Sequence, residues 1–126
     1  MRLMRAWLII FLAVLWLPAE AQAHAHHTAQ SAHADLATIS VAALPEQARD
    51  TLRVIKQGGP LAYPRDGVVF GNYERVLPKR PRGYYHEYTV KTPGARNRGA
   101  RRIISGEPGE YYYSADHYKT FKRIQE

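Results

Sequence analysis

The sequence predicts an α+β fold, in which one amphipathic helix packs on a twisted antiparallel β-sheet. Only one segment, between Pro45 and Gly58, shows the apolar periodicity of a helix. Short runs of aromatic and β-branched residues follow it, and turn signals rich in glycine and proline separate these runs. A helix that is followed only by strands favours an antiparallel sheet over an alternating βαβ winding.

Residues 1–23 have the order of a secretory signal peptide. Arg2 and Arg5 precede an uninterrupted apolar run of 12 residues at positions 6–17, and small residues recur at positions 19–23. We therefore expect cleavage after Ala23 and a mature protein that is secreted, either into a periplasm or out of the cell. A membrane anchor is the alternative, but an apolar run of this length falls short of the roughly 20 residues that span a bilayer.

Residues 24–37 form a tail rich in histidine and alanine without apolar periodicity, and we expect them to be disordered. Cleavage after Ala23 would make His26 the third residue of the mature chain, and cleavage after Ala21 would place His24 there. A free amine, two amide nitrogens and a third-position imidazole make a square-planar set for Cu(II) or Ni(II). A solvated tail is the favoured interpretation, and metal capture would be an accessory property.

Residues 38–126 are expected to form a single domain and to act as a monomer. Removal of the leader leaves 103 residues with a formal net charge of +6, compared with +7 for the whole chain. A basic surface attracts polyanions, among which nucleic acids come first. The chain has no cysteine, so neither a disulfide nor a thiolate nucleophile is available.

The expected elements of this domain start with a short strand at 38–41. The helix begins at Pro45, since the missing N–H of proline has no partner in the first turn anyway. Its buried stripe consists of Ala48, Leu52 and Ile55. Gly58-Gly59-Pro60 ends it. The strand-like runs that follow are 67–70, 73–77, 84–90, 101–105 and 117–124, and the turn signals lie at 64–67, 78–83, 92–94 and 106–109.

Within the run 84–90, period-2 alternation puts Glu87 on one face together with Tyr85 and Thr89. The other face is more apolar and should meet the helix; it consists of Tyr84, His86, Tyr88 and Val90. His86 is thereby assigned to the core, and Glu87 is predicted to point to the open face of the sheet. Arg102 and Ile104 share a face of the next run. A glutamate beside arginine stays ionised, which favours a general base.

Each of these side chains also has a purely structural interpretation. Glu87 could form an exposed cross-strand ion pair, which is worth well under ~1 kcal/mol. A single strand histidine such as His117 is often merely solvated. Asp116 before it could form a turn, and Tyr118 after it could make a packing contact.

Several segments together resemble the guanyl-specific secreted bacterial ribonucleases, small enzymes of the same superfamily as barnase. The resemblance covers residues 41–124, nearly the whole predicted domain. It rests on residues 43–46 (ALPE), 66–70 (DGVVF), 83–90 (GYYHEYTV), 92–96 (TPGAR), 98–104 (RGARRII) and 116–118 (DHY). It implies a microbial ribonuclease fold and cleavage of single-stranded RNA on the 3′ side of guanosine, through a 2′,3′-cyclic phosphate.

The resemblance implies a role for each catalytic residue. Glu87 would be the general base for the ribose 2′-OH, and His117 the general acid for the departing 5′-oxygen. Arg98 and Arg102 would hold the phosphate, and Tyr118 would hydrogen-bond it. No cofactor or metal is expected, because the arginines would supply the positive charge.

The resemblance also places guanine in the loop 70–74. Glu74 would accept hydrogen bonds from N1–H and the N2 amino group, a pair of donors that adenine lacks. Backbone N–H groups of Asn72 and Tyr73 would bind O6, and Phe70 would offer a stacking face worth ~1–3 kcal/mol. The alternative is an ordinary turn with a solvated Glu74.

Three positions depart from the family pattern. Tyr73 stands where relatives often have arginine, and its ring could form a second stacking platform. Ser40 stands at one half of a disulfide that many relatives have, and Ser105 replaces a cysteine found in some. The stability of the domain must therefore come from packing alone.

The predicted function is thus a secreted guanyl-specific endoribonuclease. Two alternatives stay open, a secreted protein that binds RNA without cleaving it and a secreted Cu/Ni-binding protein that uses the tail. The expected partners are single-stranded RNA and an acidic, barstar-like inhibitor protein that would cover the basic cleft. The mature protein is not expected to associate with a membrane.

Overall fold

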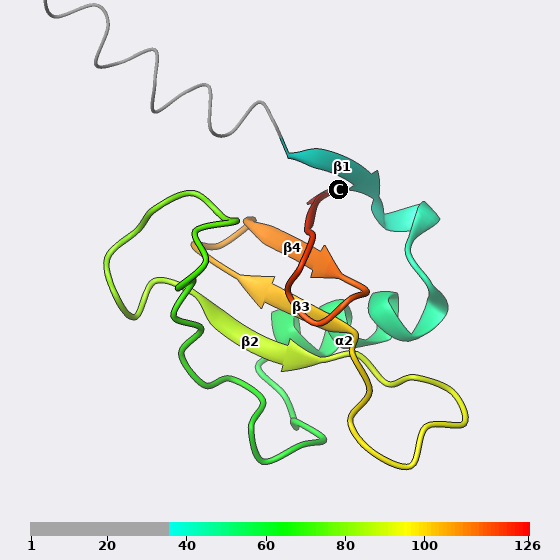
Figure 1. Cartoon of the computed structure of the whole chain (residues 1–126). Coiled ribbons are helices and arrows are strands. Elements are labelled where there is room, and N and C mark those ends of the chain that lie inside the picture. The colour runs from blue at the N-terminus through cyan, green and yellow to red at the C-terminus, as the bar shows by residue number, and fades with distance from the viewer. Residues whose placement is uncertain (1–35) are drawn as a thin grey trace, which may run out of the picture.

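A computed structural model of the chain describes residues 36–126, which form one helix on a five-stranded sheet (Figure 1). The elements in chain order are β1 (Ala37–Ser40), the 3₁₀ turn η2 (Val41–Ala43), α2 (Glu46–Gln57), β2 (His86–Thr89), β3 (Arg102–Ser105), β4 (Tyr111–Ser114) and β5 (Lys122–Gln125). The predicted α+β fold class is confirmed. No helix within residues 36–126 is long and apolar enough to cross a membrane. The predicted leader and residues 24–35 of the predicted tail, including His24 and His26, lie outside the described residues. Ala37, which the sequence assigned to the disordered tail, instead begins β1, where it pairs with Lys122.

The sheet has the strand order β1-β5-β4-β3-β2. The strands β2 to β5 pair in antiparallel fashion, as expected. β1, however, pairs in parallel with β5, with Ala37 opposite Lys122 and Ser40 opposite Gln125. The sheet is therefore mixed, and β1 and β2 occupy its two edges because the chain crosses the sheet by way of α2 before β2 begins.

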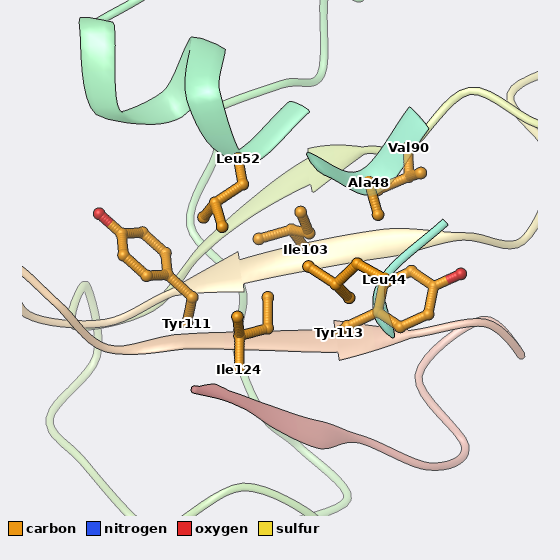
Figure 2. Close-up of a cluster of buried hydrophobic side chains, with 8 residues drawn as sticks. All are labelled: Leu44, Ala48, Leu52, Val90, Ile103, Tyr111, Tyr113 and Ile124. Atoms are coloured by element: carbon orange, nitrogen blue, oxygen red, sulfur yellow. The ribbon is translucent and has the colours of Figure 1, made fainter. Parts of the chain in front are cut away.

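The helix forms where the periodicity predicts it. Its first turn follows Pro45, and it ends at Gly58, whose φ of 80° is left-handed and therefore suits glycine. The predicted stripe packs on the sheet: Ala48 and Leu52 are buried, and Ile55 is partly buried against the same cluster. Figure 2 shows this core, in which Leu44, Ala48 and Leu52 meet Val90, Ile103, Tyr111, Tyr113 and Ile124.

A second apolar cluster lies on the other face of the sheet, and it covers the face that the sequence had left open. It consists of Leu77, Tyr85, Ile104, Tyr112 and Phe121. Tyr84 packs against this second cluster and not against the helix, so its predicted face is wrong. Glu87 does point away from the helix, but it is only 7% exposed because loops cover this face. His86 is half-buried, with Nδ1 3.0 Å from the carbonyl oxygen of Gly67.

Three predicted strands are wholly or partly replaced by loops. Residues 73–77 belong to a turn, in which the Arg75 N–H donates to Asn72 O at 3.0 Å and both residues have positive φ. Residues 67–70 run along the edge of β2 and form a single bridge, Val69 to His86. From the run 117–124 only the last part becomes strand, as β5.

The sequence interpretation missed β4. Its burial pattern explains why: Tyr111 and Tyr113 enter the helix-side core, whereas Tyr112 enters the second cluster. A strand that is buried on both faces shows no alternation of polar and apolar residues, and period-2 reasoning passes over it.

Candidate active site

The register of three neighbouring strands brings the predicted catalytic side chains to one face. Glu87 lies opposite Ile104, and Thr89 lies opposite Arg102, in the β2–β3 pair. Arg102 in turn lies opposite Ser114 at the end of β4. Because paired residues project to the same side of a sheet, these side chains share the face that carries the second apolar cluster.

The Glu87 carboxylate is buried but surrounded by donors. The Arg98 Nη2 lies 3.3 Å from Glu87 Oε1, and the Arg65 Nε lies 3.9 Å from the same oxygen. The Tyr118 hydroxyl donates to Glu87 Oε2 at 2.9 Å. Arg98 is itself oriented by Thr89, whose Oγ1 accepts from Arg98 Nε at 3.0 Å. Both carboxylate oxygens of Glu87 thus have donors within the protein, in a place where water is largely excluded.

Arg102 joins the loop before β3 to Tyr118. It is 3% exposed, and its Nη1 donates to the carbonyl oxygens of Gly99 at 2.9 Å and Arg101 at 2.8 Å. Its Nε donates to the Tyr118 hydroxyl at 3.1 Å. Burial, and next the hydrogen bond to Glu87, raise the pKa of Tyr118 to about 12. Tyr118 therefore stays protonated near neutral pH and connects the guanidinium to the carboxylate.

A tight loop after β4 presents His117. Asp116 Oδ1 accepts from the Ser114 hydroxyl and from the Thr120 N–H, both at 2.9 Å, and Ser114 Oγ accepts from the Tyr118 N–H. His117 and Tyr118 have φ values of 56° and 70°, which non-glycine residues adopt only where the surroundings impose them. The His117 N–H donates to Ala100 O at 2.9 Å, and its exposed ring lies 4.8 Å from that of Tyr118, centroid to centroid.

A cavity of about 240 Å³ adjoins these groups. Its walls include Phe70, Asn72, Tyr73 and Glu74 from the predicted binding loop, together with His117 and Tyr118. The Phe70 and Tyr118 rings lie 4.9 Å apart, centroid to centroid. The cavity thus offers an aromatic wall, a carboxylate and an imidazole within one space.

The side chain of Asn72 ties the loop 70–74 to the backbone of Leu77. Its Nδ2 donates to Leu77 O at 2.9 Å, and its Oδ1 accepts from the Leu77 N–H at 3.1 Å. The backbone N–H groups of Asn72 and Tyr73, and the carboxylate of Glu74, make no hydrogen bond to any residue of the described part of the chain. These groups are therefore available to a ligand.

The ring of Tyr73 lies directly over Gly71. A Cβ atom at Gly71 would come within 2.5 Å of Tyr73 Cε2 and Cζ, so glycine is required for this close approach. The Tyr73 hydroxyl accepts from Arg82 Nη1 at 2.8 Å. Tyr73 is 81% exposed, and its ring forms an outer wall of the cavity.

The structure brings Glu87, Arg98, Arg102 and Tyr118 into one hydrogen-bonded group, and the ring of His117 lies beside that of Tyr118 at the wall of the cavity. Sequence reasoning missed two contributors. Arg65 lies in the predicted turn 64–67, and nothing in its position in the sequence indicates the contact with Glu87. Thr89 did carry a signal, because the alternation in β2 put it on the same face as Glu87.

Comparisons with known proteins agree on one family. A family model described as ribonuclease matches residues 24–125. The guanyl-specific ribonuclease Sa of Kitasatospora aureofaciens is 58% identical over 90 residues, which are 71% of this chain and 94% of the relative. The guanyl-specific ribonuclease St of Saccharopolyspora erythraea is 54% identical over 84 residues, which are 67% of this chain and 83% of the relative.

Solved structures give the same result. Ribonuclease Sa2, in a structure described as complexes with mononucleotides, superposes with a TM-score of 0.71 at 54% identity, over 72% of this chain and 95% of that chain. Ribonuclease Sa2 with guanosine-2′-cyclophosphate superposes with a TM-score of 0.68 at 54% identity, over 71% of this chain and 96% of that chain.

Proposed function

The chain belongs to the guanyl-specific microbial ribonucleases, and we propose on this basis that it is an endoribonuclease that cleaves single-stranded RNA on the 3′ side of guanosine. The observation that carries the proposal is the position of the Glu87 carboxylate. It is buried and accepts hydrogen bonds from Arg98 and Tyr118, and Tyr118 lines the same cavity as His117. A base, an acid and positive charge close to one another are what cleavage by an internal hydroxyl needs.

In the first step, Glu87 takes the proton of the ribose 2′-OH, and the 2′-oxygen attacks phosphorus. The bond from phosphorus to the 5′-oxygen breaks, and His117 protonates this leaving oxygen. The products are a 2′,3′-cyclic phosphate and a free 5′-hydroxyl. In the second step the roles reverse: His117 takes a proton from water, the water oxygen attacks phosphorus, and Glu87 returns a proton to the 2′-oxygen.

The arginines stabilise the charge that develops on the phosphate oxygens. Arg98 is only partly covered, and its Nη2 lies beside the general base, so the same guanidinium can reach a phosphate bound there. Arg102 has Nε and Nη1 engaged by the protein and is held rigidly, which spares reorganisation when charge develops. Tyr118, protonated and positioned by Arg102, can turn its hydroxyl from Glu87 to a phosphate oxygen.

Guanine specificity follows from the polar groups of the cavity. Glu74 accepts from N1–H and the N2 amino group, while the N–H groups of Asn72 and Tyr73 donate to O6. Adenine would leave these groups unpaired, which costs about 1–3 kcal/mol for each. Phe70 and Tyr73 offer ring faces to the base.

Export belongs to the same proposal. The leader 1–23 is removed after Ala23, and the mature protein acts outside the cytoplasm as a monomer. An acidic, barstar-like inhibitor would protect the producing cell by covering the basic site. N-terminal sequencing of protein recovered from the periplasm or the medium should begin at His24; a retained leader in membrane-bound protein would contradict this part.

The test is digestion of a defined RNA in EDTA by the wild type and by Glu87→Gln. We expect the wild type to cut after guanosine and to leave 2′,3′-cyclic or 3′-phosphate ends. Loss of a general base typically costs ~10²–10⁴-fold, so the variant should be nearly inactive. Glu107→Gln, an exposed glutamate in the β3–β4 turn, is the control and should retain full activity. Undiminished cleavage by Glu87→Gln would refute the assignment of the base.

The two alternative functions are not favoured. Relatives named ribonucleases argue against a protein that only binds RNA. A metal-binding function would rest on the histidine tail, and relatives named ribonucleases give it no support.

A further inference from the structure

A second pocket lies beside the loop 70–74, and its lining is strongly basic. Its volume is about 330 Å³, and four exposed cationic side chains line it, namely Arg75, Lys79, Arg80 and Arg82. These are four of the 18 lysines and arginines of the chain, gathered within eight consecutive residues. None of the residues that line the pocket is acidic. A concave site of one charge sign concentrates ions of the other sign.

The backbone that carries these cations is fixed. The Tyr85 hydroxyl donates to Pro78 O at 2.6 Å, and both residues are buried. Asn72 holds the preceding carbonyl, that of Leu77, at 2.9 Å. Lys79 and Arg80 follow directly on this rigid base, and both are exposed. When an anion binds, this backbone needs no further ordering, and the loss of conformational freedom is confined to the side chains.

The basic pocket shares a wall with the guanine cavity. Phe70, Asn72 and Tyr73 line both spaces, and Arg82 contacts the Tyr73 hydroxyl from the basic side. His117 and Tyr118 line the guanine cavity only. The basic pocket therefore lies across the loop from the proposed catalytic groups.

This placement assigns a direction to the RNA. The 3′-phosphate of the bound guanosine must reach Glu87 and His117. The 5′-side of the same guanosine therefore points away from these groups, toward the basic pocket. We propose that the basic pocket binds the phosphate on the 5′-side of the guanosine and thereby favours guanosines within an RNA chain over those at a 5′-hydroxyl end. This inference rests on the proposed function of the neighbouring site and adds a second, sequence-independent contact to it.

The experiment compares kcat/KM for four substrates: GpU, pGpU, UpGpU and GpUpU. We expect wild-type protein to prefer pGpU and UpGpU to GpU by about tenfold or more, because a hydrogen bond to an ionised group contributes that much to binding. The double variant Lys79→Ala/Arg80→Ala should lose this preference and retain its rate on GpU. The ratio of GpUpU to GpU should not change, since GpUpU extends only on the 3′-side.

Arg53→Ala/Lys56→Ala is the matched control. It removes the same charge from exposed positions of α2, on the opposite face of the sheet. Lys79→Glu should reverse the preference for a 5′-phosphate. For longer RNA, the slope of log kcat/KM against log salt should become shallower in the double variant, by about 0.7 for each phosphate that it no longer binds. The slope should stay unchanged in the control.

Three outcomes would overturn the inference while GpU cleavage still supports the proposed function. One is the absence of a 5′-phosphate preference in the wild type, and another is its equal loss in the α2 control. In the third, the double variant keeps the preference for a 5′-phosphate but binds polyglutamate more weakly than the wild type does. This result would assign the pocket to an acidic protein. Failure of the wild type to cleave GpU, UpGpU and longer RNA would instead contradict the proposed function itself.

Discussion

A carboxylate taken out of water must find partners within the protein, and the surroundings of Glu87 show how this chain supplies them. One oxygen has two guanidiniums near it and the other accepts from a phenol, so neither oxygen is left without a partner in a covered site. The alternation of residues in β2 predicted the direction of Glu87. It could not predict the cover, because Tyr118 and Arg65 come from loops distant in sequence. A residue's face is a local property, whereas its burial depends on the whole fold.

Glu74→Ala should weaken the preference for guanosine more than it slows cleavage at other bases. The carboxylate is exposed, lines the cavity and has no hydrogen bond within residues 36–126, so its removal leaves the loop intact. We expect the ratio of kcat/KM for GpU to that for ApU to fall about tenfold or more, in line with the loss of a charged hydrogen-bond partner. Glu107→Ala removes an exposed carboxylate outside the cavity and should leave the ratio unchanged. An unaltered preference in Glu74→Ala would show that backbone N–H groups alone select the base.

At the scale of elements, the helix shows a regular apolar stripe and β2 a regular alternation, and both were predicted from these periods. β3 is buried on both faces and was predicted from its β-branched residues instead. β4 is buried on both faces, and the segment 117–124 holds a strained loop before its strand, so neither follows a simple period. The family resemblance nevertheless assigned roles to the loop residues His117 and Tyr118, and the structure places both at the wall of the cavity. A motif can be matched where periodicity carries no information.

Asp116→Ala should disturb catalysis through the loop that carries His117. Asp116 accepts hydrogen bonds from Ser114 and from both the N–H and the hydroxyl of Thr120, and these bonds stabilise the left-handed residues between them. We expect kcat on GpU to fall about 10- to 100-fold, with KM changed much less, since small misplacements of a reacting group have effects of this size. Asp50→Ala, an exposed carboxylate on α2, is the control. An unchanged kcat in folded Asp116→Ala protein would show that the loop holds its shape without this side chain.

At the scale of the whole molecule, the sheet separates a purely structural core from the face that carries the candidate active site. The face that packs on α2 holds an apolar core, and the opposite face combines a second apolar cluster with the polar site. Composition predicted a basic protein, but only the structure shows that part of the charge gathers in one pocket beside the loop 70–74. The fold class could be predicted from the sequence, and the structure brings the predicted residues Glu87, Arg98, Arg102 and Tyr118 together. The four cations of residues 75–82 are visible in the sequence, but the pocket that they line depends on how the connection between α2 and β2 folds back on itself.

A buried carboxylate at the start of β4 should make the stability of the molecule sensitive to acid. Burial opposes ionisation of Glu110 most strongly, but hydrogen bonds from the Tyr112 and Tyr84 hydroxyls outweigh it and hold the pKa of Glu110 below its usual value. A lowered pKa in the folded state contributes stability that is complete above the unfolded-state value of about 4.3. This stability is lost as pH falls through the folded-state pKa.

Glu110→Gln should therefore lower the free energy of unfolding by about 1–3 kcal/mol at pH 7, because the amide offers one acceptor oxygen to the buried Tyr112 hydroxyl and the partly buried Tyr84 hydroxyl. The difference between variant and wild type should shrink as pH falls below about 4. Urea denaturation at several pH values measures both effects, and Glu107→Gln serves as the exposed control from the same turn. A difference that is independent of pH would show that the ionised form of Glu110 contributes nothing.

The pairing of β1 with β5 has a consequence for where the enzyme can work. The first and last strands are joined through backbone hydrogen bonds, with Ser40 opposite Gln125, and no sulfur takes part. A reductant such as glutathione has nothing to cleave here. Reduction therefore cannot break the connection between the first and last strands of the described domain, which a reductant would cleave if a disulfide held it.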